Sequence, residues 1–206
     1  MSKDVSRGLL LVISSPSGAG KTTLARRLAG EFDLRFSVSY TTRQPRGEEK
    51  DGEAYFFIGR AEFEKRVALG EFLEHAEVFG NYYGTHISEL ARADRDGYDL
   101  VLDIDVQGAR QLKEKIPAAV SIFVLAPSRQ VLEERLRSRG QDSDEVIQRR
   151  LREAAEEIRN YFRYDYVLVN QEVAASIDSL VSIVKATRSR RDRMEDSIRP
   201  ILETFL

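Results

Sequence analysis

Residues 8 to 32 read Gly-Leu-Leu-Leu-Val-Ile-Ser-Ser-Pro-Ser-Gly-Ala-Gly-Lys-Thr-Thr-Leu-Ala-Arg-Arg-Leu-Ala-Gly-Glu-Phe. Leu9–Ile13 is an apolar run without polar alternation, which is typical of a parallel strand buried on both faces. The small, glycine-rich Ser14–Gly20 predicts a loop. Leucine and phenylalanine then recur at helical spacing, which predicts a helix over Lys21–Phe32. We therefore expect a strand, a loop and a helix in direct succession.

The same alternation continues along the chain. Apolar strands are predicted at Leu100–Ile104, Ile122–Leu125 and Tyr166–Val169. Helical patterns follow them at Gln107–Lys115, Ser128–Arg137 and Ala174–Arg188. This order predicts an α/β fold of three layers, in which helices flank a central parallel sheet. Two more helices are predicted, over Ala155–Tyr164 and Met194–Leu206.

Two stretches interrupt this rhythm. Residues 37–96 are longer than a crossover connection needs, and they contain a predicted helix at Ala61–Leu69 and a short aromatic strand at Ala54–Ile58. We interpret them as an inserted lobe. Residues 138–145 are polar and separate two arginine-bearing helices, which predicts a lid. The chain is thus one domain with a core (1–36, 97–137 and 151–206), a lobe (37–96) and a lid (138–150).

Gly18-Ala19-Gly20-Lys21-Thr22 stands between a predicted strand and a predicted helix, the context that a phosphate-binding loop requires. Glycines let successive N–H groups point into one cavity, and the helix N-terminus adds positive dipole. The usual pattern has glycine six residues before the lysine, where this chain has Ser15. The alternative is a glycine-rich turn before a helix that begins with lysine. The predicted ATP contacts in this loop are Ser17, Gly18, Ala19, Gly20, Lys21, Thr22 and Thr23.

A metal site is predicted beside this loop. The Thr22 hydroxyl can ligate Mg²⁺, and an acidic residue at the end of a neighbouring strand usually completes such a site, directly or through water. Asp103 directly follows the apolar run Leu100–Leu102, so it is the better candidate than Asp105. Asp103 could instead cap the following helix.

The inserted lobe carries a second candidate phosphate site. Arg43 and Arg46 are three residues apart beside hydroxyl groups, and Pro45 lies between them. Two such arginines can clamp a phosphate bidentately. By themselves they are equally consistent with surface charge.

Several separate motifs then occur in one order along nearly the whole chain. They are Ser-Pro-Ser-Gly-Ala-Gly-Lys-Thr at 15–22, Thr-Thr-Arg-Gln-Pro-Arg at 41–46, Gly-Asn-Tyr-Tyr-Gly at 80–84, Leu-Asp-Ile-Asp-Val-Gln-Gly at 102–108, Arg-Leu-Arg-Ser-Arg-Gly at 135–140 and Val-Leu-Val-Asn at 167–170. In these motifs the chain closely resembles the guanylate kinases. The resemblance implies a P-loop kinase fold with an inserted GMP-binding lobe and a lid. It also implies γ-phosphoryl transfer from ATP to GMP, or to dGMP, with Mg²⁺.

The resemblance also implies a role for each matching residue of the lobe. It assigns the GMP phosphate to Arg43, Arg46, Tyr55 and Tyr83, and the guanine to Ser39, Glu74, Thr85 and Asp105. The chemistry agrees, because guanine offers N1–H and N2–H₂ donors to carboxylates and adenine lacks both. A site of this kind discriminates strongly. Without the resemblance, Glu74 would be interpreted as an exposed acid on a strand.

In the lid region the resemblance assigns Arg135, Arg139 and Arg150, with Lys21 and Arg43, to the reacting phosphates. A closing lid would bring cations to the charge that develops there and exclude water. The alternative is surface pairing with nearby glutamates. The resemblance also assigns an adenine contact to Asn170, which follows the last strand and could equally cap that strand.

Composition limits the other classes of function. The 206 residues include no cysteine and two histidines, which excludes disulfides and thiolate metal sites and disfavours a histidine-rich one. The net charge of −2 argues against binding nucleic acid through a broad basic surface. Apolar runs are too short for a membrane span or a signal peptide, so we expect a cytoplasmic protein. Of 32 basic residues 25 are arginine, which fits a phosphate ligand or surface composition alone.

Two other functions stay open at this point. A non-catalytic guanylate-kinase-like binding module is disfavoured by the intact Lys21, Thr22 and Asp103. A related P-loop kinase acting on a sugar phosphate is disfavoured by Glu74 and Asp105. No general base is expected, because the acceptor would be a phosphate oxygen that is largely ionised near pH 7.

Overall fold

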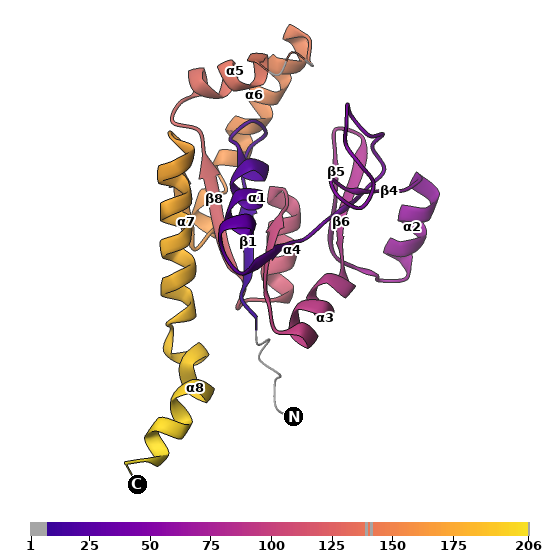
Figure 1. The fold of residues 1–206 in the computed structure, drawn as a ribbon. Helices are drawn as coiled ribbons and strands as arrows, with labels where there is room; N and C mark the ends of the chain where they lie inside the picture. Colours follow the sequence, from indigo (N-terminus) through magenta and orange to yellow (C-terminus); the bar gives the residue numbers. More distant parts are fainter. Residues whose placement is uncertain (1–7, 139, 141, 206) are drawn as a thin grey trace.

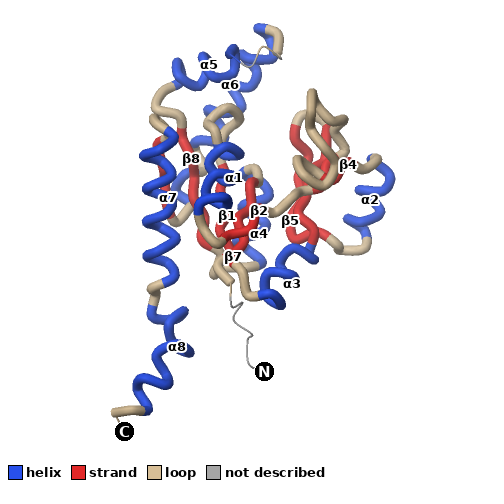
Figure 2. Tube along the Cα trace, viewed as in Figure 1, coloured by secondary structure: helices blue, strands red, loops and turns tan. Residues whose placement is uncertain are grey.

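The computed structural model describes residues 8–138, 140 and 142–205. Its large sheet has the strand order β2-β7-β1-β8-β9, and all neighbouring strands are parallel (Figures 1 and 2). The strands are β1 (Leu10–Ser14), β2 (Leu34–Phe36), β7 (Asp99–Asp103), β8 (Val120–Leu125) and β9 (Tyr166–Val169). The four strands predicted for this sheet are confirmed to within two residues. Strand β2 was missed because it is three residues long and only Leu34 is buried.

Helices cover both faces of this sheet, as predicted. The apolar residues of β1 point to both faces of the sheet, which explains why apolar and polar residues do not alternate in its sequence. Leu11 and Ile13 pack into one core cluster with α1 (Lys21–Glu31), whereas Leu10 and Val12 pack into the other. The first cluster also contains residues of α5 (Arg129–Ser138), α6 (Asp144–Ile158) and α7 (Val173–Arg188), and the second contains residues of α3 (Ile87–Asp96) and α4 (Val106–Lys115).

The inserted lobe forms a second sheet with the strand order β4-β3-β6-β5. Its strands are β3 (Tyr40–Thr41), β4 (Phe56–Phe57), β5 (Phe72–Val78) and β6 (Asn81–His86), and α2 (Arg60–Ala68) packs beside it. The helix predicted at 61–69 is confirmed, whereas the strand predicted over 54–58 shrinks to two residues. Glu74 and Thr85 are buried within β5 and β6, so polar residues hide the apolar alternation of these strands from sequence analysis.

The helix predicted over Ala155–Tyr164 is wrong. Helix α6 begins eleven residues earlier, at Asp144, and ends at Ile158; a short 3₁₀ turn, η1, follows over Tyr161–Arg163. Ser143 caps α6 by accepting a hydrogen bond from the Val146 N–H. The buried residues of α6 recur at helical spacing. The polar interruption between α5 and α6 is therefore short.

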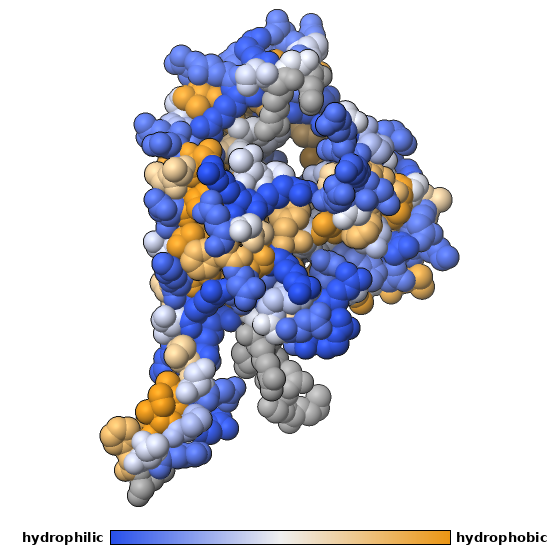
Figure 3. Space-filling view, in the orientation of Figure 1, coloured by the Kyte–Doolittle hydropathy of each residue, from blue (hydrophilic) through white to orange (hydrophobic). Residues whose placement is uncertain are grey.

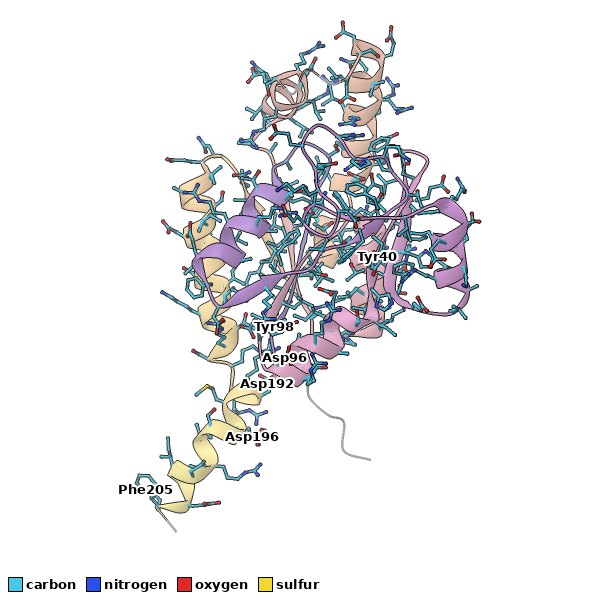
Figure 4. All side chains as sticks on the ribbon, turned by 45° about the vertical axis from the view of Figure 1, so that its right-hand side comes forward. Tyr40, Asp96, Tyr98, Asp192, Asp196 and Phe205 are labelled. Atoms are coloured by element: carbon cyan, nitrogen blue, oxygen red, sulfur yellow. The ribbon has the colours of Figure 1, made fainter. Side chains whose placement is uncertain are left out.

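Helix α8 (Arg191–Glu203) projects beyond the rest of the molecule below α7, with Phe205 near its tip (Figures 1 and 4). None of its residues is buried, and an apolar patch near its end contains Ile201 and Leu202 (Figure 3). The helix predicted over 194–206 is confirmed over 194–203; it starts three residues earlier than predicted, and Leu206 lies outside the described residues. Within the described part of the chain, no helix combines the length and apolar character that a bilayer crossing requires.

Candidate active site

The loop after β1 lies at the carboxyl end of the central strand, and it leads directly into the N-terminus of α1. Gly20 has a φ of 95°, and a Cβ there would lie 2.6 Å from Asn170 Nδ2, so this position needs glycine. Ser15, in place of the usual first glycine, is buried and donates a hydrogen bond from Oγ to the Pro16 carbonyl at 2.8 Å. The loop thus has the strand-loop-helix geometry of a phosphate site.

Three side chains meet where β1 and β7 end side by side. The Thr22 hydroxyl donates a hydrogen bond to Asp103 Oδ2, and Lys21 Nζ lies 3.5 Å from Asp103 Oδ1. The negative charge of Asp103 raises the pKa of Lys21, so this lysine is a cation at neutral pH. The N-terminus of α4 is capped by Asp105, not by Asp103, since Asp105 Oδ1 accepts a hydrogen bond from the Gly108 N–H at 2.9 Å.

The donor set of Thr22 and Asp103 fits Mg²⁺. Both offer hard oxygen ligands, and Asp103 Oδ1 makes its ion pair without accepting a hydrogen bond. Mg²⁺ is usually held by one or two protein oxygens together with substrate phosphates and water. The described residues hold no group of three or more histidine, cysteine or acidic side chains suited to a metal.

Asn170 and Arg135 hold the phosphate loop from behind. Asn170 Nδ2 donates to the Ala19 carbonyl at 2.8 Å, and its Oδ1 accepts from Ser176 Oγ at 3.0 Å. Arg135 donates to the carbonyls of Asn170, at 2.8 Å, and Ala19, at 3.4 Å. Both residues therefore contact the loop itself, a role that sequence analysis missed. The adenine and phosphate contacts expected of them stay predictions.

Two adjoining cavities, of about 440 and 190 Å³, connect the loop to the inserted lobe. Ser39, Arg46, Tyr55 and Asp103 line both. Figure 3 shows the surface hollowed between the helices α5 and α6 and the lobe. The structure thus brings Lys21, Thr22 and Arg150 to the same two cavities as most of the predicted acceptor residues, whereas Arg135, Asn170 and Thr85 line neither cavity.

The larger cavity contains the predicted phosphate clamp. Arg43 is buried and pairs bidentately with Glu49, through contacts of 2.9 and 3.0 Å. Glu49 also accepts from the Arg46 backbone N–H at 2.8 Å, and the bond from Arg43 lowers the pKa of Glu49. The rings of Tyr55 and Tyr83 meet edge to face at 5.8 Å. Sequence analysis missed Glu49, which an anionic ligand must displace or share.

The smaller cavity contains the predicted base site. Glu74 is only 2% exposed and its Oε1 accepts no hydrogen bond, although this atom is buried. Burial raises the pKa of Glu74 to about 7. Ser39 and Thr85 lie beside one another, with their hydroxyl oxygens 3.5 Å apart. A Cβ at Gly108 would lie 2.2 Å from Glu74 Oε2, so α4 leaves space for this carboxylate by having glycine there.

The lid side of the same cavity is formed by α6. Arg150 lines it and pairs with Asp142 at 3.1 Å. Glu157, which sequence analysis did not select, also lines it, and burial raises the pKa of Glu157 to about 7 against the opposing effect of Lys21. Glu157 lies in a helical stretch with many other charged residues, so nothing in the sequence marks it as a site residue. Arg139 lies outside the described residues.

Fold and site together define a P-loop protein of the α/β class, with cavities beside the loop that are lined in part by an inserted lobe. The model of the guanylate kinase family matches residues 7–187. Similar curated proteins include the guanylate kinases of Geobacter metallireducens (50% identical, covering 93% of this chain and 95% of the relative) and Escherichia coli strain K12 (46%, covering 98% and 99%). The solved guanylate kinase of Anaplasma phagocytophilum is 36% identical, covers 93% of both chains and has a TM-score of 0.78. The chain belongs to the guanylate kinase family.

Proposed function

We propose that this protein transfers the γ-phosphoryl group of ATP to GMP and releases ADP and GDP. The observation that supports this proposal best is Glu74, a buried carboxylate with an unpartnered oxygen in a cavity that reaches the phosphate loop. A buried acceptor of this kind needs a donor from the ligand. The N1–H and N2–H₂ groups of guanine supply such donors, and membership of the guanylate kinase family agrees.

At the donor side, the α1 N-terminus and Lys21 would bind the ATP phosphates. Arg135, Arg139 and Arg150 would approach the transferred group as the lid closes. Thr22 and Asp103 would hold Mg²⁺ together with the nucleotide, and the bound ion would supply charge neutralisation at the phosphates. The phosphate of GMP would bind Arg43, Arg46, Tyr55 and Tyr83, with Glu49 displaced or shared.

No residue needs to remove a proton from the acceptor. A phosphate monoester has a second pKa of about 6, so its attacking oxygen is already ionised at neutral pH. What the chain contributes is alignment of two phosphates and cancellation of their charge. The two histidines lie outside both cavities, which fits this mechanism.

Specificity would come from the base site. Adenine presents an unprotonated N1 where guanine presents N1–H, so AMP would leave Glu74 Oε1 without a donor and place two acceptors face to face. Ser39, Thr85 and Asp105 would complete the guanine site. We expect dGMP to be a second acceptor, because no assigned contact involves the ribose 2′-hydroxyl.

The test is ADP formation from ATP and Mg²⁺ with GMP, dGMP, AMP, UMP or ribose 5-phosphate as acceptor, with Lys21→Ala as the inactive control. We expect turnover with GMP and dGMP only. GMP binding without turnover would support a non-catalytic guanylate-kinase-like binding module instead. Turnover of ribose 5-phosphate alone would support a P-loop kinase that acts on a sugar phosphate. Equal turnover of AMP would refute the role of Glu74.

A further inference from the structure

The tip of the β5–β6 hairpin holds an aromatic residue in an unfavourable conformation. Val78 pairs with Asn81, so Phe79 and Gly80 form a two-residue turn, with φ values of 51° and 78°. Such turns favour Asn-Gly, since both central residues are left-handed. Phe79 is the one non-glycine residue with positive φ in the described part of the chain. For a bulky residue this conformation is uncommon and tends to mark a functional position.

The Phe79 ring belongs to neither hydrophobic core cluster, and 41% of the residue is exposed. Its neighbours are two cations of α6. The guanidinium carbons of Arg150 and Arg149 lie over the ring, 5.1 and 5.5 Å from its centroid. The hairpin is part of the inserted lobe, and α6 carries Arg150, one of the three arginines assigned to the lid region. The ring therefore bridges the two parts that surround the cavity.

Arg150 is the better placed of the two arginines. It lines the smaller cavity together with Phe79 and Glu74, and its side chain is 11% exposed. Its Nε is buried without a hydrogen-bond partner, and its ion pair is with Asp142. The guanidinium thus has unused donor capacity in the cavity that reaches the phosphate loop.

We propose that Phe79 is a positioning residue that holds the Arg150 guanidinium at the reaction cavity through a cation–π contact. An aromatic face attracts the cation but leaves the in-plane N–H donors free for phosphate oxygens. A second carboxylate in its place would compete with the phosphates for the same donors. The left-handed turn presents the ring to α6, which gives a reason for phenylalanine at a position that suits asparagine. This proposal rests on the proposed phosphoryl transfer.

The first experiment compares Phe79→Leu with Phe79→Tyr in steady-state assays of GMP phosphorylation. Leucine keeps apolar volume without a π face, so we expect kcat to fall about two- to fivefold, the range that an exposed cation–π contact corresponds to. KM for GMP should change less than twofold, and Phe79→Tyr should retain the wild-type kcat. The matched control is Phe162→Leu, because Phe162 is 69% exposed and also lies under an arginine, but outside both cavities. Equal kcat values for the leucine and tyrosine variants of Phe79 would overturn the proposal.

A double-mutant cycle with Arg150→Met separates positioning from a general structural effect. If Phe79 acts through Arg150, Phe79→Leu should lower kcat in the wild-type background and leave it unchanged in Arg150→Met. The same fractional loss in both backgrounds would contradict the proposal.

A fluorescence measurement does not depend on the proposed reaction. The chain contains no tryptophan, so Phe79→Trp introduces a single reporter. Its emission in the ligand-free protein should change when Arg150 is replaced by methionine, but not when the exposed Arg159, at the end of the same helix, is replaced. An unchanged emission would refute the contact. A change in emission together with no GMP turnover by the wild-type protein would keep the contact and refute the proposed function.

Discussion

Replacing Glu74 with glutamine is expected to stabilise the ligand-free protein at pH 8. Glu74 is 2% exposed, and burial raises its pKa from the ordinary value of 4.5 to about 7. At about 1.4 kcal/mol per pH unit, keeping this carboxylate ionised in the folded chain costs about 3 kcal/mol. Glutamine has nearly the same shape and carries no charge, so it removes this cost.

The pH dependence gives the sign of the effect. Below pH 4.5 the carboxyl is protonated in both the folded and the unfolded chain, and no cost arises. As the pH rises from 4.5 to 7 the unfolded chain loses this proton first, so the free energy of unfolding falls. Above pH 7 the cost is complete. The advantage of Glu74→Gln should therefore be under about 1 kcal/mol at pH 5 and about 3 kcal/mol at pH 8.

The assay is urea unfolding of both proteins at pH 5 and pH 8, with thermal unfolding as a second measurement. For a chain of this size, 3 kcal/mol corresponds to an increase in Tm of roughly 6–12 °C at pH 8. Glu77→Gln is the matched control, because Glu77 lies on the same strand with its side chain exposed. A stability difference between Glu74→Gln and wild type that is the same at both pH values would refute the burial explanation.

GMP should reverse the order of stability. In the wild type, the guanine N–H groups would pair with the ionised Glu74, so saturating GMP should raise the Tm. In Glu74→Gln the amide meets those N–H groups with one of its own donors, and the GMP-induced increase in Tm should be much smaller. An equal increase in Tm in both proteins would show that the guanine of GMP does not bind at Glu74.

Three other variants test the rest of the site. Arg43→Ala should raise KM for GMP at least about tenfold, the value of a lost charged hydrogen bond, while KM for ATP stays within twofold. The opposite pattern in steady-state kinetics would show that GMP does not bind at Arg43. Gly108→Ala places a methyl group against the Glu74 carboxylate, so GMP affinity measured by calorimetry should fall about tenfold, and unchanged affinity would show that α4 need not leave this space. Asn170→Ala removes the support of the phosphate loop, so affinity for a non-hydrolysable ATP analogue should fall about fivefold, whereas weaker GMP binding alone would contradict this role.

The large sheet was predictable because each of its long strands is a continuous apolar run followed by a helical pattern. The lobe was harder, since Glu74 lies buried in β5 where sequence patterning would place an apolar residue. Helix α6 begins earlier than the sequence pattern predicts, because half of its first eight residues are charged and interrupt the apolar periodicity.

The contiguous part of the site followed from the sequence alone. Residues 15–22 need only local backbone geometry to become a phosphate loop, so their order and their flanking elements were sufficient. The resemblance to guanylate kinases added candidate site residues that are distant in the chain, but it did not say where they lie in the structure. It could not indicate that Glu49 already pairs with Arg43, because that contact depends on how the loop between them folds.

The sequence by itself determined the four longest strands of the large sheet, the phosphate loop and the kinds of side chain available to two phosphates. Those features depend on neighbours within a few residues. Only the tertiary structure decided which distant groups meet: Asp103 with Thr22, 81 residues apart, Gly108 with Glu74, and Phe79 with Arg150. The physical reason is that burial, charge pairing and ring contacts arise from packing between elements, and the same residues on an isolated segment would face water.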